Sequence, residues 1–349
     1  MSLWLSRRRT YVACAVLSAA LPACTGNGSP RRSGQAAVDA SPERDVGDVS
    51  VRDAVARAAA DATSADATAS MPTLPADVVR RTRDAHERFG DAARVRTVGG
   101  TFVLVETAHA TPLFDQAVAL LDRALPPLFD ARFDRHPDKA VTVLFFQTPA
   151  AYAAYEREHH PDAGATLGLY RKGPREIAVD LSGGGAYLPT LTHEVVHVLV
   201  ESDFPDAPHW LNEGLATLFE APVFTGDGGI HGQARNLRDD VLRPALASQN
   251  ERERAAVRLD ALFRMTRADF EGNDERTRRL HYALTRSVCA WLDARGTLWP
   301  FYRAFRDGYA EDETGERAFL RATGGTPGEM DAQWSKWARY AWAPRRAPR

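Results

Sequence analysis

The stretch TLTHEVVHVLV, residues 190–200, decides how this sequence folds, because it places a charged motif inside an otherwise uncharged and mostly aliphatic run. If the run is helical, His193 and His197 project from one face about one turn apart. Both imidazoles can then reach a single zinc ion at the usual distance of about 2.0–2.1 Å. Glu194 lies one step round the helix, where it can orient a water on the metal. We therefore expect a metal site on a helix buried at the centre of a domain.

The motif HExxH is short, and a random chain of this composition contains it in roughly one or two cases per hundred. The competing interpretation is a helix on which the two histidines and Glu194 have no chemical role. That interpretation leaves an unpaired carboxylate in an apolar run, where burying its charge is costly. The metal site is therefore the better hypothesis.

A catalytic zinc site needs a third protein ligand and keeps one position open. Residues 208–220, PHWLNEGLATLFE, predict a second helix after the turn-forming residues 202–206. If this helix returns beside the first, Glu213 comes to lie opposite the two histidines. The alternative ligand is Asp203, ten positions after His193, where the pattern HExxHxxGxxH has its last ligand. That pattern breaks the helix with a glycine, and Val200 stands there, so Glu213 is favoured.

HEVVH at 193–197 followed by WLNEGLA at 210–216 resembles the gluzincin zinc peptidases, which are the thermolysin and aminopeptidase clan. The pattern is most similar to the peptidase MA-like domains of bacterial exported proteins, over about residues 102–309. The resemblance implies a single Zn²⁺ ion bound by His193, His197 and Glu213. It also implies that Glu194 acts as the general base.

The same resemblance implies how substrate is bound and turned over. The run 176–181 would be the edge strand that pairs with an extended peptide or protein substrate. We expect Tyr282, at the start of a late helix, to stabilise the oxyanion, with rival donors at His231, His281 and His209. Thr217 is a departure, because thermolysin-like enzymes place an aspartate four residues after the ligand glutamate, where it bonds a ligand histidine. The partner of that histidine is therefore unassigned in this sequence.

The predicted activity is zinc-dependent hydrolysis of peptide bonds, as an endopeptidase by resemblance. The alternative from another class is a catalytically silent, peptidase-like lipoprotein that binds or scaffolds cell-envelope components. Hydrolysis of a non-peptide amide is also compatible with the motif. The enzyme is favoured because all three ligands and Glu194 are present.

The order of periodic segments predicts an α+β domain over residues 76–343. A strand-rich part, 98–182, is followed after GGG at 183–185 by a part that is helical in pattern, 186–343, and by a tail at 344–349. We expect a small mixed or antiparallel sheet with an edge strand, packed on the helix that carries HExxH. The strands are predicted at 101–107, 140–146, 167–170 and 176–181, and the first helices at 112–129 and 149–159.

The N-terminus has the features of an export signal. RRR at 7–9 precedes an eleven-residue apolar run that ends in LPAC at 21–24. Eleven residues are too few to cross about 30 Å of hydrocarbon, which takes roughly 20. LPAC resembles a bacterial lipoprotein signal, so we expect residues 1–24 to be the signal and Cys24 to anchor the chain to a membrane of the cell envelope. Simple secretion is the alternative.

Composition sets further limits on structure and partners. Residues 25–75 have no aromatic residue and are rich in Ala, Asp and Ser, which predicts a disordered linker. Cys289 is the one cysteine of the predicted domain, so no disulfide framework is expected and a buried structural thiol is predicted. The net charge of -2 offers no basic surface for a phosphate backbone, so nucleic acid is not an expected partner. We expect a monomer.

Overall fold

The computed structural model describes residues 12–14, 74–108, 110–160, 166–233, 236–272 and 274–340, with the backbone alone at 12–14. The predicted signal at 1–24 lies outside the described residues except at 12–14. Cys24, nearly all of the predicted linker and the predicted tail also lie outside them. None of the helices within the described ranges combines the length and the apolar character that a membrane-spanning segment needs.

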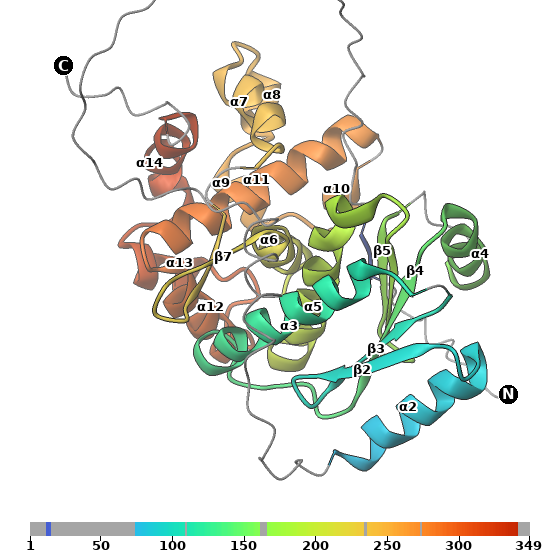
Figure 1. Ribbon diagram of the computed structural model, residues 1–349. Helices are drawn as coiled ribbons and strands as arrows, with labels where there is room; N and C mark the ends of the chain where they lie inside the picture. The colour runs from blue at the N-terminus through green and yellow to red at the C-terminus, as the bar shows by residue number, and fades with distance from the viewer. Residues whose placement is uncertain are drawn as a thin grey trace, which may run out of the picture.

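A mixed sheet forms the first half of the domain (Figure 1). Its strands are β1 (Val12–Cys14), β2 (Arg94–Val98), β3 (Phe102–Glu106), β4 (Val141–Phe146), β5 (Gly168–Arg171) and β6 (Glu176–Asp180). They lie in the order β1-β5-β6-β4-β3-β2. Strands β3, β4 and β6 are parallel, whereas β2 pairs antiparallel with β3, β5 with β6, and β1 with β5.

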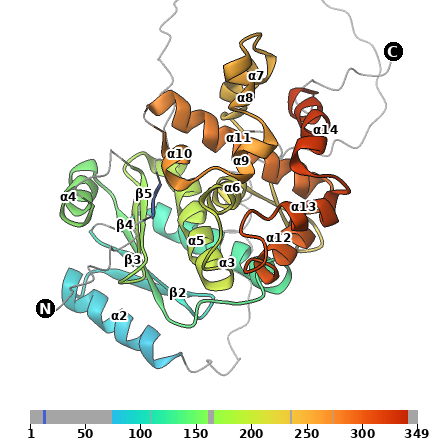
Figure 2. The same ribbon diagram turned by 180° about the vertical axis from the view of Figure 1, so that it is seen from behind.

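Helices cover both faces of this sheet, as Figures 1 and 2 show. Helices α3 (Pro112–Ala131) and α5 (Leu188–Asp203) pack on one face, and α2 (Ala76–Phe89) and α4 (Pro149–His159) pack on the other. Successive side chains of a strand point to opposite faces, so Leu104 joins the core under α3 and α5, and Val103 the core under α2 and α4. Burial on both faces explains why the central strands are almost continuously apolar.

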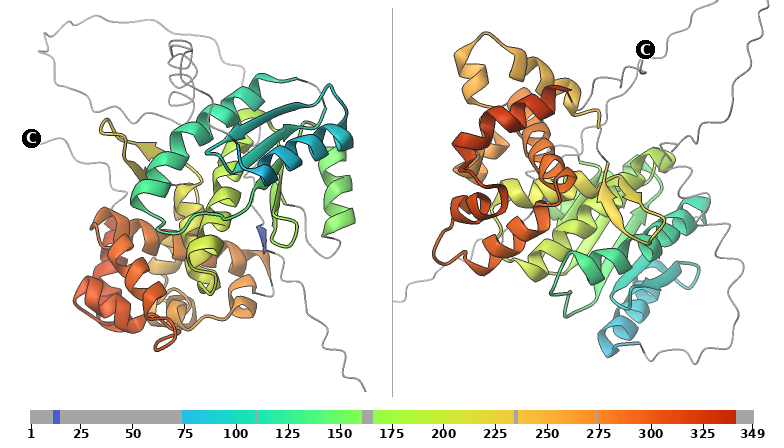
Figure 3. Two further views of the ribbon diagram at one scale, coloured as in Figure 1. Left: turned by 90° about the horizontal axis from the view of Figure 1, so that it is seen from below. Right: turned by 90° about the vertical axis from the view of Figure 1, so that its left-hand side faces the viewer.

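The second half is mainly helical and packs on α5 through α6 (His209–Phe219), as two further views show (Figure 3). Its other elements are η1 (Gly184–Tyr187), α7 (Asp239–Ala247), α8 (Glu251–Ala255), α9 (Leu259–Phe263), α10 (Arg267–Glu271), α11 (Glu275–Ala294), α12 (Leu298–Asp307), α13 (Glu316–Thr323) and α14 (Pro327–Tyr340). Helix α11 lies very close to α6. A Cβ atom added at Gly214 on α6 would be only 2.6 Å from Cys289 Sγ on α11. The Cys289 side chain is fully buried and unbridged, which confirms the predicted structural thiol, and burial raises its pKa.

The predicted α+β class is confirmed, since a mixed sheet precedes a helical C-terminal half. The prediction that residues 176–181 form the edge of the sheet is wrong. Strand β6 lies between β4 and β5, and all five of its residues are buried. Its apolar centre, residues 177–179, is therefore explained by an interior position, and the charge of Glu176 is paired with Arg88 and Arg171.

The helical half also contains a small hairpin, which corrects the expectation of helix throughout residues 186–343. Strands β7 (Pro222–Phe224) and β8 (Ile230–Gly232) pair antiparallel around a turn in which Gly228 has a φ of +82°. Strands of three residues are too short to show an alternating pattern in the sequence. Helix α2 and strand β2 were likewise not predicted, because charged residues interrupt the apolar positions of both.

Candidate metal centre

Helix α5 carries the HExxH motif through the middle of the domain. Every side chain of residues 188–200 is buried except that of Pro189. Pro189 lies in the first turn, where a helix has no partner for the N–H that proline lacks. The helix ends at Asp203, two residues before Pro205, which disfavours helical geometry in the residue preceding it. The helical spacing brings the rings of His193 and His197 to a centroid distance of 4.8 Å.

Helix α6 supplies the third member of the cluster. Glu213 lies one turn into α6 and is fully buried, and its Oε2 is 3.6 Å from His193 Nε2 and 3.7 Å from His197 Nε2. Asp203, the alternative ligand, is engaged elsewhere. Both of its carboxylate oxygens accept from Arg306 Nη1 at 2.8 Å, and Oδ1 also accepts from the Arg135 backbone N–H at 2.8 Å. The structure therefore brings Glu213, and not Asp203, to the two histidines.

The three side chains form a donor set that fits a divalent ion. One ligand atom from each of His193, His197 and Glu213 lies within 4.8 Å of the others, and all three residues are buried. Around a tetrahedral ion at about 2.0–2.1 Å, neighbouring ligand atoms stand about 3.3 Å apart. The spacings of 3.6 and 3.7 Å thus need to shrink by only a few tenths of an ångström. The cluster can hold one divalent metal ion.

Neighbouring groups keep His197 in the form that binds metals. Its Nδ1 lies 2.9 Å from Asn212 Oδ1, and a proton on Nδ1 leaves the lone pair on Nε2. Within the described part of the chain this Nε2 makes no hydrogen bond. Burial lowers the pKa of His197 to about 4, so the ring is neutral at neutral pH. The pKa of Glu213 also lies below its ordinary value, because the imidazoles of His197, His193 and His209 outweigh the opposing effect of burial.

Glu194 is completely buried beneath β5. A Cβ atom at Gly168 would lie 2.8 Å from Glu194 Oε1, so the strand can approach the carboxyl group this closely only with a glycine there. Burial raises the pKa of Glu194 to about 8, and the nearby His193 and the Tyr170 backbone N–H offset only part of that rise. The group therefore holds a proton at neutral pH until a positive charge comes near, and then becomes a base.

Sequence reasoning missed a second carboxylate beside His193. Glu220 directly follows α6, and its Oε2 lies 3.6 Å from His193 Nδ1. Its Oε1 accepts hydrogen bonds from Asn236 Nδ2 at 2.8 Å and from Arg238. Burial by itself would raise the pKa of Glu220, but the charge of Arg238, with help from His193, lowers it to about 2. The signal was in the sequence, because Glu220 is seven residues after Glu213 and so lies on the same helical face.

The residues considered as oxyanion donors lie in different surroundings. Tyr282 is 3% exposed on α11, and its ring packs edge-on against Phe270 at 5.1 Å. The ring of His209 packs against the same Phe270 at 4.8 Å, and its Nδ1 is 3.9 Å from Glu213 Oε1. His281 Nδ1 bonds the Phe270 carbonyl at 2.8 Å, and His231 is paired with Asp293 at the surface. Among the rivals, His209 is thus the one beside the cluster, and the role of Tyr282 stays a prediction.

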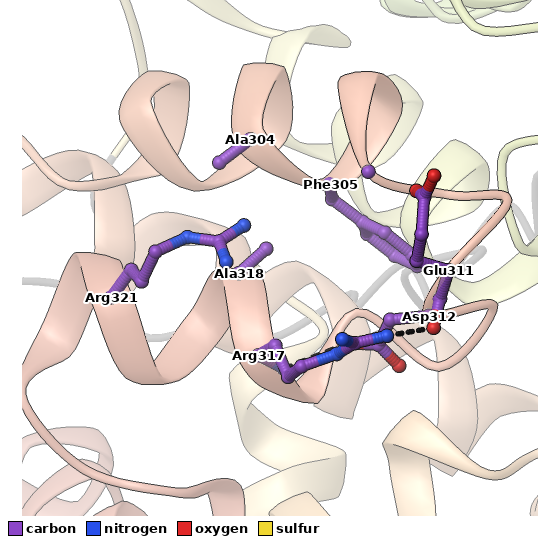
Figure 4. Close-up of a pocket in the computed structure, with 8 residues that line it drawn as sticks. Ala304, Phe305, Glu311, Asp312, Arg317, Ala318 and Arg321 are labelled. Atoms are coloured by element: carbon purple, nitrogen blue, oxygen red, sulfur yellow. Dashed lines mark hydrogen bonds and ion pairs between the residues drawn. The ribbon is translucent and has the colours of Figure 1, made fainter.

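A separate hollow of about 220 Å³ lies between α12 and α13 (Figure 4). The side chains of Arg317 and Asp312 in its wall lie 3.8 Å apart, so their charges offset each other. It contains no histidine or cysteine, and its surroundings offer no counterpart to the buried cluster. The residues that line it are Ala304, Phe305, Gly308, Glu311, Asp312, Arg317, Ala318 and Arg321.

In comparisons with known proteins, this chain matches no family model and no curated protein. The resemblance to gluzincin peptidases therefore rests on the motif residues alone. What the structure adds is their placement, with His193, His197 and Glu213 gathered in one buried group.

Proposed function

We propose that this protein is a zinc-dependent peptidase. The observation that carries the proposal is the buried group of His193, His197 and Glu213. Glu194, which follows His193 in the sequence, is also buried. A buried carboxylate such as that of Glu213, beside the His197 imidazole that burial keeps neutral, is costly unless a positive ion balances its charge. Strongly shifted pKa values of grouped side chains are also typical of functional sites.

The proposed roles follow from this placement. Bound zinc would supply a Lewis acid and a water of lowered pKa. His193, His197 and Glu213 would hold the ion as its three protein ligands. Glu194 accepts a proton from the attacking water at its carboxylate and delivers it to the leaving amine. Tyr282 is the proposed donor to the oxyanion.

The proposed path of the substrate is along β5, not along β6. Strand β5 lies over Glu194, and on the side away from β6 it pairs with β1. Residues 12–14 of β1 belong to the proposed export signal, so cleavage before Cys24 would remove the strand that pairs with this edge of β5 in the described part of the chain. An extended peptide added as a strand would pair with the same edge and pass close to Glu194.

The proposed location is the cell envelope, with residues 1–24 as a cleaved signal and a lipid on Cys24. The features that support this are the basic and apolar pattern and the LPAC sequence. Labelling of cells with a radioactive fatty acid should mark the protein, and the Cys24→Ser variant should lose the label. An unlabelled but exported wild-type protein would favour simple secretion.

The enzyme proposal is tested with Glu194→Gln, which keeps the size of the side chain and removes the proton acceptor. We expect wild-type protein to hold one zinc ion and to cleave an unstructured protein such as casein. The variant should hold the same zinc and cleave at least about 10²-fold more slowly. Glu201→Gln is the matched control, because Glu201 lies on the same helix but is paired with Lys172 at 3.4 Å.

Each outcome of this comparison has a definite meaning. Equal cleavage by wild type and Glu194→Gln would exclude the proposed mechanism. Stoichiometric zinc without cleavage by either protein would favour the silent lipoprotein that binds or scaffolds envelope components. Wild-type protein without zinc, measured by elemental analysis, would refute the metal site itself.

A further inference from the structure

The end of α6 meets α5 next to the first histidine of the motif. Glu220 is 5% exposed, and its backbone carbonyl accepts a hydrogen bond from Thr192 Oγ1 at 2.9 Å. Its side chain extends to the neighbouring residue on α5, where Oε2 lies 3.6 Å from His193 Nδ1. Glu220 therefore contacts two successive residues of α5, one through its backbone and one through its carboxylate.

The two oxygens of this carboxylate have different partners. Oε1 is held by Asn236 Nδ2 at 2.8 Å and by the guanidinium group of Arg238. Arg286 on α11, 1% exposed, places a second positive charge nearby. Among the described residues, Oε2 makes no hydrogen bond, and His193 Nδ1 is its ion-pair contact. Asn236 and Arg238 thus hold Oε1 in place, and Oε2 faces the His193 imidazole.

A carboxylate beside Nδ1 determines which nitrogen of the imidazole carries the proton and which is free to bind a metal. It favours a proton on Nδ1, which leaves the lone pair on Nε2, the nitrogen that lies 3.6 Å from Glu213. The distance of 3.6 Å to Glu220 is a few tenths of an ångström longer than a hydrogen bond. Thr217 cannot take this role, because its hydroxyl donates to the Glu213 carbonyl within its own helix at 2.6 Å.

We propose that Glu220, anchored by Arg238 and Asn236, is the positioning residue that fixes the ring orientation and tautomer of His193. The proposal rests on the metal site of the proposed function and assigns the partner of His193, which the sequence left open. The two histidines are then held differently, His197 by the neutral Asn212 and His193 by a charged carboxylate.

The test compares wild type, Glu220→Gln and Glu316→Gln as purified full-length protein. Glu316 is the matched control, because it is also paired with an arginine, Arg264, at 3.0 Å, but lies on α13. Zinc affinity is measured by competition with a chromophoric chelator. We expect Glu220→Gln to bind zinc about 10-fold to 100-fold more weakly than wild type, and Glu316→Gln to bind it as wild type does.

A second readout does not depend on zinc or activity. In metal-free protein, long-range ¹⁵N–¹H spectra of the histidine rings report which nitrogen carries the proton. Wild-type His193 should be protonated at Nδ1, and Glu220→Gln should lose that preference while His197 keeps its own. Zinc affinity and a His193 tautomer both unchanged in Glu220→Gln would overturn the proposal.

A third variant guards against misfolding of Glu220→Gln. Arg238→Gln removes the guanidinium group that bonds Glu220 Oε1. Arg238 is partly exposed and lies outside α5 and α6, so the variant should keep the circular dichroism spectrum of wild type. We expect a several-fold loss of zinc affinity. Wild-type affinity in a folded Arg238→Gln variant would also count against the anchoring role. Failure of wild-type protein to bind zinc would instead refute the proposed function, so the two failures can be told apart.

Discussion

Replacing Gly168 by alanine would put a methyl group where β5 touches α5. The added Cβ would lie 2.3 Å from Thr190 Cγ2 and 2.8 Å from Glu194 Oε1. Both contacts are shorter than the 3.4 Å at which ordinary contacts begin, so Thr190 must move by about 1.1 Å and the Glu194 carboxylate by about 0.6 Å. The substitution therefore strains the core and displaces the proposed base together.

The expected magnitudes follow from these displacements. Overpacking of a dense core costs about 1–3 kcal/mol, which for a domain of this size lowers the thermal midpoint by roughly 2–10 °C. A misplacement of about 1 Å at a reacting group lowers the rate about 10²-fold, so Gly168→Ala should slow casein cleavage roughly 10-fold to 100-fold. Zinc content should stay at one ion, because the atoms nearest to the new methyl group belong to Thr190 and Glu194 and not to a proposed ligand.

Calorimetry and casein cleavage are measured beside two control variants. Gly226→Ala is the matched glycine control, since a Cβ atom there meets nothing within 4 Å. Adding Thr190→Ser to Gly168→Ala removes the methyl group in the closest contact, and should restore stability more than activity. If Gly168→Ala has the thermal midpoint and the cleavage rate of Gly226→Ala, the close packing of β5 on Glu194 is refuted.

Three further predictions concern the buried charged groups. Asp203→Ala removes the partner shared by Arg306 and the Arg135 N–H, although Arg306 keeps Asp134 and Asp307, so urea unfolding should show a loss of about 1–3 kcal/mol with zinc retained, whereas loss of zinc from the folded variant would reinstate Asp203 as a ligand. Tyr282→Phe keeps the packing on Phe270, so the folded variant should cleave about 10²-fold more slowly, and unchanged cleavage would remove Tyr282 from the mechanism. In metal-free protein the pKa of Glu194 is raised from 4.5 to about 8, so between these values the folded state binds more protons than the unfolded state and stability falls as pH rises. Urea titrations at pH 5 and pH 8 should show this fall in wild type but not in Glu194→Gln, and equal slopes would contradict the raised pKa.

The cluster of His193, His197 and Glu213 could be predicted because its members are close in sequence. His193 and His197 are related by one helical turn, and a single turn separates their helix from the one that carries Glu213. Such relations follow from helical periodicity and helix-breaking residues alone. The same periodicity would have located Glu220.

The partners of Glu220 could not be found in this way. Asn236 and Arg238, which hold its Oε1, lie just before α7, so their contacts depend on how the helical half folds back on α6. The pairing of strands is a similar case. The run at 176–181 predicted a strand, but its interior position depends on parallel pairing with β4 across α4, which no local pattern specifies.

The proposed ligands come from α5, which packs on the sheet, and from α6, which packs on α5 and on α11 of the helical half. An ion bound there would tie these two parts together, and at a free concentration one hundred times its Kd it would stabilise the folded chain by about 2.7 kcal/mol. In the proposed location outside the cytoplasm, the supply of the proposed zinc ion would then affect how much of the protein stays folded. Removing the ion with a chelator would take away this stabilisation, and should make the purified chain easier to cleave by an added protease.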